Sequence, residues 1–395
     1  MLGVISTINI STTTNNLINN NFPSLQVLTL SNNLIEFVNF EHFPKTIGFV
    51  DLTKPTISLE HLNLAQNLIT SINSNIFNIF KSIRRLDLSY NKIISIEENS
   101  FTSLIFIESL DLNSNKLNKL PLNLFNNNYL NNSIKQINLA LNNFTKIPIN
   151  SLNYLNNLIY LNFDGNYLNN NNGEGNYLFN KNNKLNELIL SRNLFEAIPT
   201  EILNKLNSLQ LLDLSFNLIS KIGKMAFGSY YEGLEGSSPL QKLNLANNFI
   251  EELSEPSTFL YLVNLIQLNL KNNKIKLITK SAIERLESLE IINLEIKILN
   301  LAHNKITNIQ PESFQNLPKL EQLFINNNKL IILETKLTKL REQFVDSQLI
   351  EYINISNNKL KRFNIQQTIN SLKIFIAKNN QIEFLNSEML QIEDD

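Results

Sequence analysis

A single pattern, LxxLxLxxNxI or a close variant, recurs along the whole chain and limits what the chain can fold into. Its asparagine occurs fourteen times, which makes chance an untenable explanation. These asparagines are Asn33, Asn67, Asn91, Asn115, Asn142, Asn166, Asn193, Asn217, Asn248, Asn273, Asn304, Asn328, Asn358 and Asn380. Repetition at this spacing is typical of a solenoid, in which each unit contacts only its neighbours. The chain is therefore predicted to form one elongated domain, although its 395 residues alone would suggest two or three globular ones.

Apolar and polar residues alternate around the second leucine of the pattern. In IRRLDLSYNKI, the polar Arg85 and Asp87 flank the apolar Leu86. This alternation predicts a short strand with one buried face. Because the same alternation returns in each repeat, the strands are predicted to stack side by side into one parallel sheet.

The repeating asparagine is predicted to stabilise the stacking of neighbouring repeats. One repeat buries about seven apolar side chains at roughly 1.5 to 3 kcal/mol each, whereas ordering its backbone costs roughly 1 to 2 kcal/mol per residue. A single repeat therefore cannot fold alone. A buried asparagine amide can bond the turn backbone of its own coil and of the adjacent coil, so that stacked repeats are joined by a ladder of amides.

The second half of the repeat is regular as well. Five of the thirteen spacings between one asparagine and the next are 24 residues, as from Asn67 to Asn91. In six repeats a phenylalanine stands ten residues after the asparagine and is predicted to pack beneath the side opposite the sheet. These residues are Phe43, Phe77, Phe101, Phe125, Phe227 and Phe314.

The unit LxxLxLxxNxLxxLxxxxFxxL resembles the 24-residue "typical" class of leucine-rich repeat proteins over nearly the whole chain. The resemblance implies an α/β repeat solenoid, a horseshoe with one parallel sheet on its concave side and loops or short helices on its convex side. It also implies a non-catalytic binding scaffold, as in receptor ectodomains and secreted matrix proteins. The predicted boundaries are a degenerate N-terminal repeat or cap at 1–24, a solenoid of about 14 repeats at 25–380, and a C-terminal cap or tail at 381–395.

The ends of the chain depart from the extracellular members of that family. The chain has no cysteine, whereas those members usually carry cysteine-rich caps. Its N-terminus lacks the basic region and long apolar core of a signal peptide, and no stretch approaches the ~20 apolar residues of a membrane-spanning helix. Either the protein is intracellular, or this chain lacks its leader and anchor. The repeat class slightly favours an extracellular or cell-surface location over the cytoplasm. Asparagine makes up about 70 of the residues, which an AT-rich coding sequence explains.

The sequence offers little chemistry for catalysis, cofactors or metals. His42, His61 and His303 are the three histidines, and the last lies many repeats from the others. No phosphate-binding GxxxxGK[ST] loop is present. Asp87 and Asp111 occupy the consensus Asp/Asn position of the repeat, so they are predicted to be structural and not cation ligands. We therefore expect no enzyme activity, no cofactor and no metal site.

Charge gives no reason to expect a nucleic acid or an anionic membrane as partner. The net charge is −1, and the basic residues are scattered along the chain. Lys81, Arg84 and Arg85 form the one dense basic group. It is predicted to be a solvated rim.

The side chains that flank the second leucine of each repeat do not pack in the core, so they are the predicted determinants of binding. In the last third of the chain several of them are apolar, which is unusual for a free surface. The predicted protein-binding patch is Ile298, Phe324, Tyr352, Ile374 and Ile376. A second patch that ranks below it is Tyr160, Ile189, Leu211 and Phe216. Repeat drift or a packing cap is the alternative explanation for these residues.

The function that follows is a protein-protein interaction scaffold that binds a protein partner on its concave face and is monomeric or weakly self-associating. Two alternatives stay open. One is an intracellular signalling adaptor or the regulatory arm of an enzyme, which the missing cysteines and leader favour. The other is a structural matrix protein, which would self-associate through the same surfaces.

Overall fold

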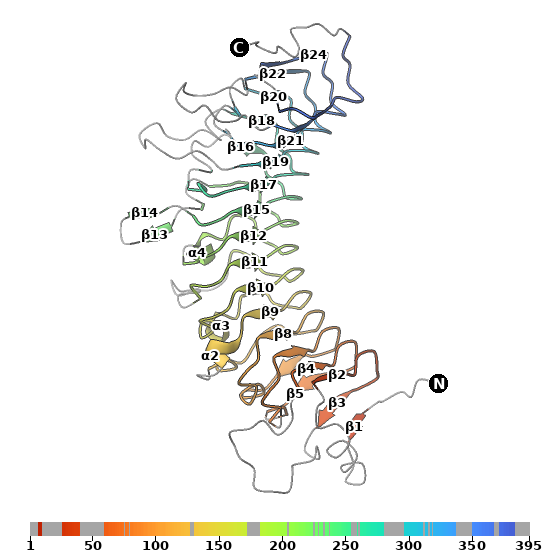
Figure 1. Cartoon of the computed structure of the whole chain (residues 1–395), viewed down its shortest axis with the longest axis vertical. Coiled ribbons are helices and arrows are strands. Elements are labelled where there is room, and N and C mark those ends of the chain that lie inside the picture. Colours follow the sequence, from red (N-terminus) through yellow and green to blue (C-terminus); the bar gives the residue numbers. More distant parts are fainter. Residues whose placement is uncertain are drawn as a thin grey trace. The chain divides into compact units, whose positions relative to one another are not determined.

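The computed structural model describes seven stretches of the chain. They are 7–9, 26–39, 59–171, 182–279, 296–336, 350–366 and 371–383, without 75, 79, 127–129, 204, 224–225, 228, 232–233, 237, 254–258, 260, 311–312, 315–316 and 318. The chain divides into two compact units, Met1–Ile189 and Leu190–Asp395. Each unit is a stack of coils (Figure 1).

Fourteen three-residue strands among the described residues belong to a parallel sheet, one for each asparagine of the pattern, as the alternation of polar and apolar residues predicts. The first unit supplies β2 (Val27–Thr29), β4 (His61–Asn63), β6 (Arg85–Asp87), β8 (Ser109–Asp111), β9 (Gln136–Asn138), β10 (Tyr160–Asn162) and β11 (Glu187–Ile189). The second unit supplies β12 (Leu211–Asp213), β15 (Lys242–Asn244), β17 (Gln267–Asn269), β19 (Ile298–Asn300), β21 (Gln322–Phe324), β23 (Tyr352–Asn354) and β25 (Ile374–Ile376). The central residue is buried in all of these strands except the first and the last, β2 and β25. Leu62, Leu86 and Leu110 share one register and are at most 1% exposed.

The asparagines form the predicted ladder. Asn67 is 4% exposed, and its Nδ2 donates to the carbonyls of Leu64 and Ala65 in its own coil, at 3.0 and 3.1 Å, and of Leu30 in the preceding coil, at 2.9 Å. Its Oδ1 accepts the backbone N–H of Ile35 at 3.1 Å. In twelve of the fourteen coils the amide is seen to join its own coil to the one before it, which confirms the role predicted for this residue.

The residue immediately before each ladder asparagine has a left-handed backbone conformation, with φ between +52° and +65°. The sequence pattern did not reveal this column. It turns the chain so that its N–H meets the next coil, as when Tyr90 donates to the carbonyl of Asn113 at 2.9 Å. The column consists of Asn32, Gln66, Tyr90, Ser114, Leu141, Gly165, Arg192, Phe216, Asn247, Asn272, His303, Asn327, Asn357 and Asn379.

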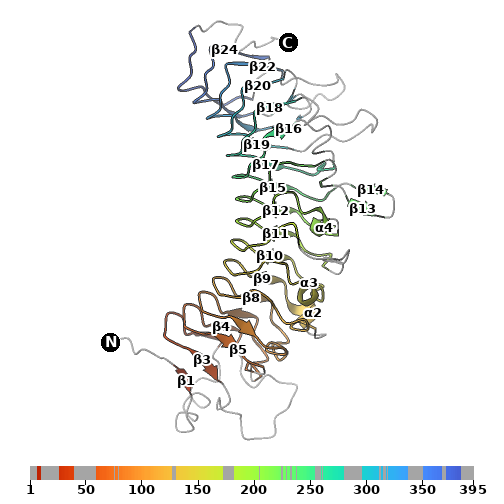
Figure 2. The ribbon, with the colours of Figure 1, turned by 180° about the vertical axis from the view of Figure 1, so that it is seen from behind.

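The side of each coil opposite the sheet contains short elements and the phenylalanine core. The described helices are α2 (Leu130–Ser133), α3 (Ile149–Leu152) and α4 (Thr200–Leu203). Three minor parallel sheets accompany them. The first pairs β5 (Ser71–Ile72) with β7 (Ser95–Ile96), the second joins β16 (Glu252–Leu253), β18 (Leu277–Ile278) and β20 (Asn308–Ile309), and the third pairs β22 (Ile332–Lys336) with β24 (Arg362–Gln366). Figure 2 shows these elements from behind. Phe101 stacks between Phe77 and Phe125, with ring centroids 5.9 and 6.4 Å away, and all three are fully buried. Phe227 and Phe314 are also buried, at 5% and 2% exposure, whereas Phe43 lies outside the described residues.

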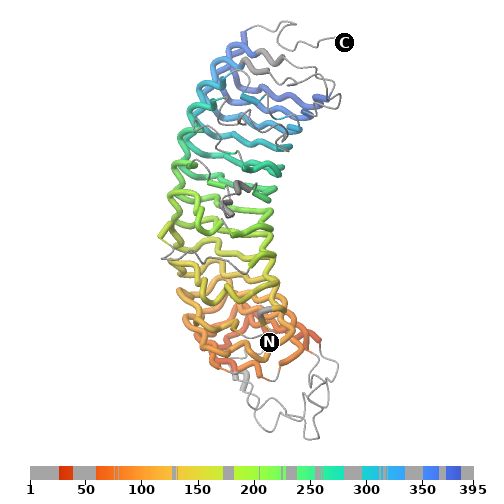
Figure 3. Tube along the Cα trace, turned by 90° about the vertical axis from the view of Figure 1, so that its left-hand side faces the viewer, coloured from red at the N-terminus to blue at the C-terminus, as the bar shows by residue number. Residues whose placement is uncertain are grey.

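Two further elements depart from the simple coil. β13 (Ser229–Tyr231) and β14 (Leu234–Gly236) form an antiparallel hairpin beside the coils of the second unit (Figure 1). In the predicted N-terminal cap, β1 (Thr7–Asn9) pairs in parallel with β3 (Phe37–Asn39). The rest of 1–24, and all of the predicted C-terminal cap except 381–383, lie outside the described residues. Figure 3 follows the coils of each unit along the Cα trace.

Candidate functional site

The outward positions of the sheet are the first and third residues of each strand, and the third residue has a repeating structural task. In ten coils it is Asn or Asp, and its side-chain oxygen accepts the backbone N–H two residues later at 2.8 to 3.2 Å. Such a local bond fixes the turn that leads to the ladder asparagine. Asp87 and Asp111 are two of these residues. Their carboxylates stabilise the turn of their own coil, which agrees with the structural role predicted for them.

Phe324 and Ile376 break this rule in the second unit. Both occupy the third position of their strands, so an apolar side chain stands where a turn-forming amide or carboxylate stands in ten other coils. The Phe324 ring lies against Tyr352 on the next strand, with the centroids 5.0 Å apart and the planes tilted by 37°. The phenol oxygen of Tyr352 also accepts a 3.3 Å hydrogen bond from Asn354 Nδ2.

The structure brings the five predicted partner-binding residues onto consecutive strands of one unit. Ile298, Phe324, Tyr352, Ile374 and Ile376 come from β19, β21, β23 and β25, whose registers place Tyr352 between Gln322 and Ile374. Ile374 is 49% exposed and the other four are half-buried. We call these five residues the apolar sheet patch.

Charged pairs border the apolar sheet patch where its strands begin. Lys297 Nζ lies 2.8 Å from Glu321 Oε1, and Lys373 Nζ lies 2.7 Å from Glu351 Oε1. Each of these residues directly precedes a strand of the patch. An apolar centre with a polar rim is the usual anatomy of a protein interface.

The second predicted patch draws on both units. Tyr160 and Ile189 lie half-buried on β10 and β11 of the first unit, and burial raises the pKa of the Tyr160 phenol. Leu211 is half-buried on β12 of the second unit, and Phe216, in the left-handed column of the same unit, is 55% exposed. In the first unit Tyr160 and Ile189 lie on adjacent paired strands, and Ile189 occupies the third strand position, as Phe324 and Ile376 do in the second unit.

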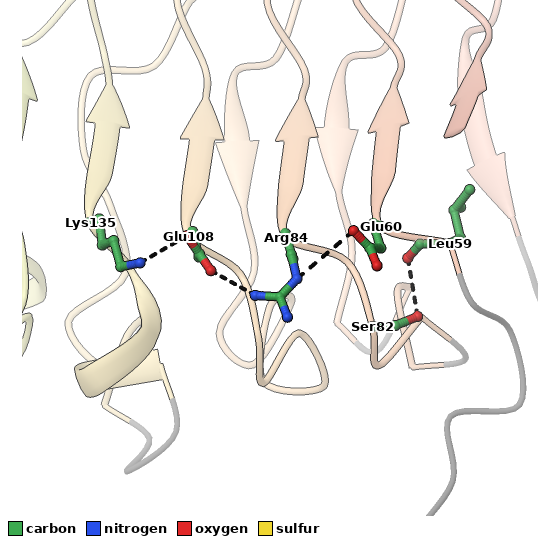
Figure 4. A network of polar contacts seen from close by, with 6 residues as sticks. All are labelled: Leu59, Glu60, Ser82, Arg84, Glu108 and Lys135. Atoms are coloured by element: carbon green, nitrogen blue, oxygen red, sulfur yellow. Dashed lines mark hydrogen bonds and ion pairs between the residues drawn. The ribbon is translucent and has the colours of Figure 1, made fainter. Parts of the chain in front are cut away.

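A ladder of ion pairs in the first unit was missed by the sequence analysis. Glu60, Arg84, Glu108 and Lys135 each directly precede a strand and alternate in charge along the sheet edge (Figure 4). Arg84 lies 3.9 Å from Glu60 and 2.7 Å from Glu108, and Lys135 lies 2.9 Å from Glu108. The Arg84 side chain is 48% exposed, which agrees with its prediction as part of a solvated rim, but it is paired with two glutamates, which the sequence did not predict. Aligning the repeats by their asparagines, instead of scanning for local charge runs, would have revealed the alternation.

The hydrogen bond from Lys135 lowers the pKa of the Glu108 carboxyl; burial opposes this, and Arg84 adds to the lowering. A carboxyl whose pKa is lower in the folded state stabilises the fold above its unfolded pKa of about 4.3, and that contribution is lost as the pH falls through the folded pKa.

We therefore expect Glu108→Gln to lower the melting temperature at pH 7, and to lower it less at pH 2, far below the unfolded pKa of about 4.3. The difference at pH 7 should correspond to less than about 1 kcal/mol, because the carboxyl is partly exposed and screened by solvent. Thermal melts of both proteins at the two pH values measure it. An equal difference at both pH values would mean that the loss does not come from the ionised pair.

We also searched the described residues for a metal-binding cluster. Nowhere in the described stretches do three His, Cys, Asp or Glu side chains come close enough together to hold a metal ion. His303 contacts Asn327, at 3.2 Å, and His42 lies outside the described residues. None of the described helices has the length and apolar character to span a bilayer.

Comparisons with known proteins agree with the coil structure. Three regions of the chain, 57–117, 238–296 and 295–342, match a family profile described as "Leucine rich repeat". Over 115 residues the chain is 35% identical to the leucine-rich repeat-containing G-protein coupled receptor 5 of Rattus norvegicus, a match that takes in 29% of this chain and only 12% of the receptor.

Solved structures show the same fold at low sequence identity. An internalin from Listeria monocytogenes superposes with a TM-score of 0.57 at 20% identity, covering 93% of this chain and 89% of the other. A leucine-rich repeat protein from Leptospira interrogans gives 0.57 at 21% identity, covering 98% and 91%. A chain of the Toll–Spatzle complex of Drosophila gives 0.52 at 19% identity, covering 87% and 48%. With its fourteen asparagine-laddered coils and these matches, the chain is a leucine-rich repeat protein.

Proposed function

We propose that this chain is a non-catalytic interaction scaffold that binds a protein partner through the apolar sheet patch of its second unit. The observation that carries the proposal is the replacement of the turn-forming residue by Phe324 and Ile376, next to Tyr352. These two coils give up a local hydrogen bond that ten others keep, and they present apolar surface instead. Partly exposed aromatic side chains are enriched among the residues that dominate binding energy.

The surroundings of the patch support a protein as the partner. Asn300, Gln322 and Asn354 lie between the apolar side chains and can bond backbone or side-chain groups. The pairs Lys297–Glu321 and Glu351–Lys373 add charges of both signs at the margin. This mixture of apolar anchors and balanced polar groups suits a folded protein surface better than a strongly charged polymer.

An extracellular or cell-surface location belongs to the same proposal. Its support is that the chain resembles a rat G-protein coupled receptor in part of its sequence and a chain of the Toll–Spatzle complex in its fold. Tyr160 and Leu211 stay candidates for additional partner contacts in their own units.

Site-specific photo-crosslinking tests the proposal. A photoreactive phenylalanine is placed at Ile374 and, as a matched control, at Ile331, because both side chains are 49% exposed in the same unit and Ile331 lies off the sheet. After irradiation in extracts of the producing cells, we expect a discrete adduct from Ile374 and none from Ile331. Adding Phe324→Ser and Tyr352→Ser should reduce the Ile374 adduct by about tenfold or more, because each aromatic anchor is worth about 2 kcal/mol.

Circular dichroism and thermal melts must first show that the double variant is folded. An adduct of equal yield from both positions, or one that survives the double substitution in a folded protein, would remove the apolar sheet patch as the binding surface.

A further inference from the structure

The residue directly after each ladder asparagine forms a row along the edge of the sheet where its strands end. In four successive coils of the second unit that residue is a lysine: Lys274, Lys305, Lys329 and Lys359. The backbone N–H of Lys305, Lys329 and Lys359 donates to the preceding coil at 2.8 to 2.9 Å, so the lysines are in register. Successive lysines are therefore about 4.8 Å apart, the spacing of neighbouring strands. We call these four residues the lysine row.

One carboxylate lies near the lysine row: Glu251, which pairs with Lys276 at 2.9 Å, has its pKa lowered in part by the charges of Lys274 and Lys305. The charges at the other end of the row, on Lys329 and Lys359, have no such neighbour among the printed ion pairs of the described residues. Lys305, Lys329 and Lys359 are exposed, and none of the three forms an ion pair with a residue that the structure describes. Elsewhere in the same unit the pattern differs, since Lys297 and Lys373 each face a glutamate at less than 3 Å. The sequence analysis treated the basic residues as scattered, because 24 to 31 residues of chain separate each lysine of the row from the next.

Apolar side chains continue the same row on the preceding coils. Leu194, Leu218 and Phe249 occupy the position directly after their ladder asparagines and are 41%, 40% and 40% exposed. The backbone N–H groups of Leu218, Phe249 and Lys274 each donate to the preceding coil at 2.9 Å. The Lys274 ammonium lies 4.3 Å from the Phe249 ring centroid, so the apolar and cationic parts of the row meet there.

A shallow hollow of about 570 Å³ lies on the sheet side of this row, and no residue of the row itself lines it. Its lining includes Asn247, Asn272 and His303, which stand two residues before Phe249, Lys274 and Lys305. Side-chain amides of this kind can donate to and accept from the backbone of an extended peptide.

We propose that this edge of the second unit binds an extended protein segment with an apolar half and an acidic half. Acidic side chains would neutralise the lysine row, and apolar ones would cover Leu194, Leu218 and Phe249. The seven coils from Leu194 to Lys359 span about 29 Å at about 4.8 Å per coil, which an extended segment of about nine residues matches at about 3.3 Å per residue. The proposal concerns a different surface from the apolar sheet patch and does not depend on it.

A bilayer with anionic lipids is a weaker match. The three apolar side chains are only about two-fifths exposed, so they lie against their coils and cannot enter a hydrocarbon layer. A nucleic acid would use the lysines but would leave the apolar half of the row without a matching contact.

Fluorescence anisotropy with the whole chain tests the proposal. The probe is a labelled peptide of about nine residues, with leucine and phenylalanine in its first half and glutamate in its second, matched to the proposed span. We expect binding that weakens with added salt and is at least about tenfold weaker when glutamine replaces the glutamates. A peptide of the same composition in which leucine or phenylalanine alternates with glutamate should also bind more weakly, because neither half of the row would then meet only its matching side chains.

Charge reversal locates the site. Lys305→Glu, Lys329→Glu and Lys359→Glu together should raise the Kd of the acidic peptide at least about tenfold. The matched control reverses the exposed Lys92, Lys116 and Lys146, which changes the net charge equally in the first unit and should alter the Kd by no more than about twofold. The corresponding Lys→Gln triple variant serves if the charge-reversed protein does not fold, which circular dichroism shows.

Several outcomes would overturn the proposal. Unchanged peptide binding in the folded triple variant would exclude the lysine row, and equal loss in the control variant would reduce the effect to net charge. Vesicles of phosphatidylcholine with phosphatidylserine, or an oligothymidylate, could also bind through the lysine row while the peptide does not; the ligand would then be a lipid surface or a nucleic acid. The double variant with Phe324→Ser and Tyr352→Ser should bind the peptide normally, because the apolar sheet patch is a different surface. The peptide experiment therefore tests the lysine row even if the apolar sheet patch binds no partner.

Discussion

Phe101→Ala is expected to lower the free energy of unfolding by about 3 to 5 kcal/mol, the largest effect of any single substitution considered for this chain. The Phe101 ring is fully buried and stacked between Phe77 and Phe125 of the adjacent coils. Its removal leaves a cavity that neither neighbour can fill without leaving its own coil. Because the ring contacts a coil on each side, the substitution weakens two inter-coil interfaces. Urea titration followed by circular dichroism measures the loss.

Phe106→Ala is the matched control for Phe101→Ala. Phe106 follows Phe101 closely along the chain but is 48% exposed, so its truncation removes little buried surface and should cost less than about 1 kcal/mol. If the two variants unfold at the same urea concentration, the phenylalanine column does not have the packing role that its burial indicates.

Asn217→Ala is expected to lower the free energy of unfolding by about 3 kcal/mol. Asn217 is 2% exposed, and its Nδ2 donates to the carbonyls of Leu190, Leu214 and Ser215 at 3.0 to 3.2 Å. Its Oδ1 accepts the backbone N–H of Phe195 at 3.1 Å. Alanine leaves these four buried backbone groups without the amide, and a buried polar group without a partner costs about 1 to 3 kcal/mol.

Two companion variants show whether the lost bonds cause the effect. Asn308→Ala removes an exposed asparagine of the same unit and should change the urea midpoint very little. Asn217→Asp keeps the size and the acceptor but replaces the donor with a carboxylate that faces three carbonyls, so it should be at least as unstable as Asn217→Ala near neutral pH. A stable Asn217→Asp protein would contradict the assignment of the amide as a donor to the adjacent coil.

The sheet and the ladder could be predicted from sequence because each depends on local pattern. Alternating polarity around residues such as Leu86 is enough to predict a strand, and the predicted strands and amide bonds are present. The segment that leads to Asn304 contains strand β19, and the Asn304 amide donates to the carbonyl of Leu270 in the preceding coil. These features need no knowledge of distant parts of the chain beyond the repeat itself.

Contacts between different repeats were harder to predict because they depend on which side chains the solenoid aligns. The partners of Arg84 lie 24 residues away in each direction, and no local run of charge indicates the ladder. The stacking of Phe324 on Tyr352 likewise depends on a register between strands. The apolar sheet patch could be predicted as a set of unusual residues. The turn-forming hydrogen bond that Phe324 and Ile376 cannot make could not be predicted, because its role is evident only from the ten coils of the structure that have it.

The left-handed column before the ladder asparagines also restricts how this chain can change over time. Isoleucine is frequent in the sequence, yet none of the fourteen residues in the column is isoleucine, valine or threonine. A branched β-carbon crowds the backbone at positive φ, whereas asparagine and glycine tolerate it. Isoleucine can therefore replace residues at many surface positions, while the backbone excludes it here. Asparagine accounts for six of these positions, and the repeat can accumulate substitutions elsewhere without losing its turn.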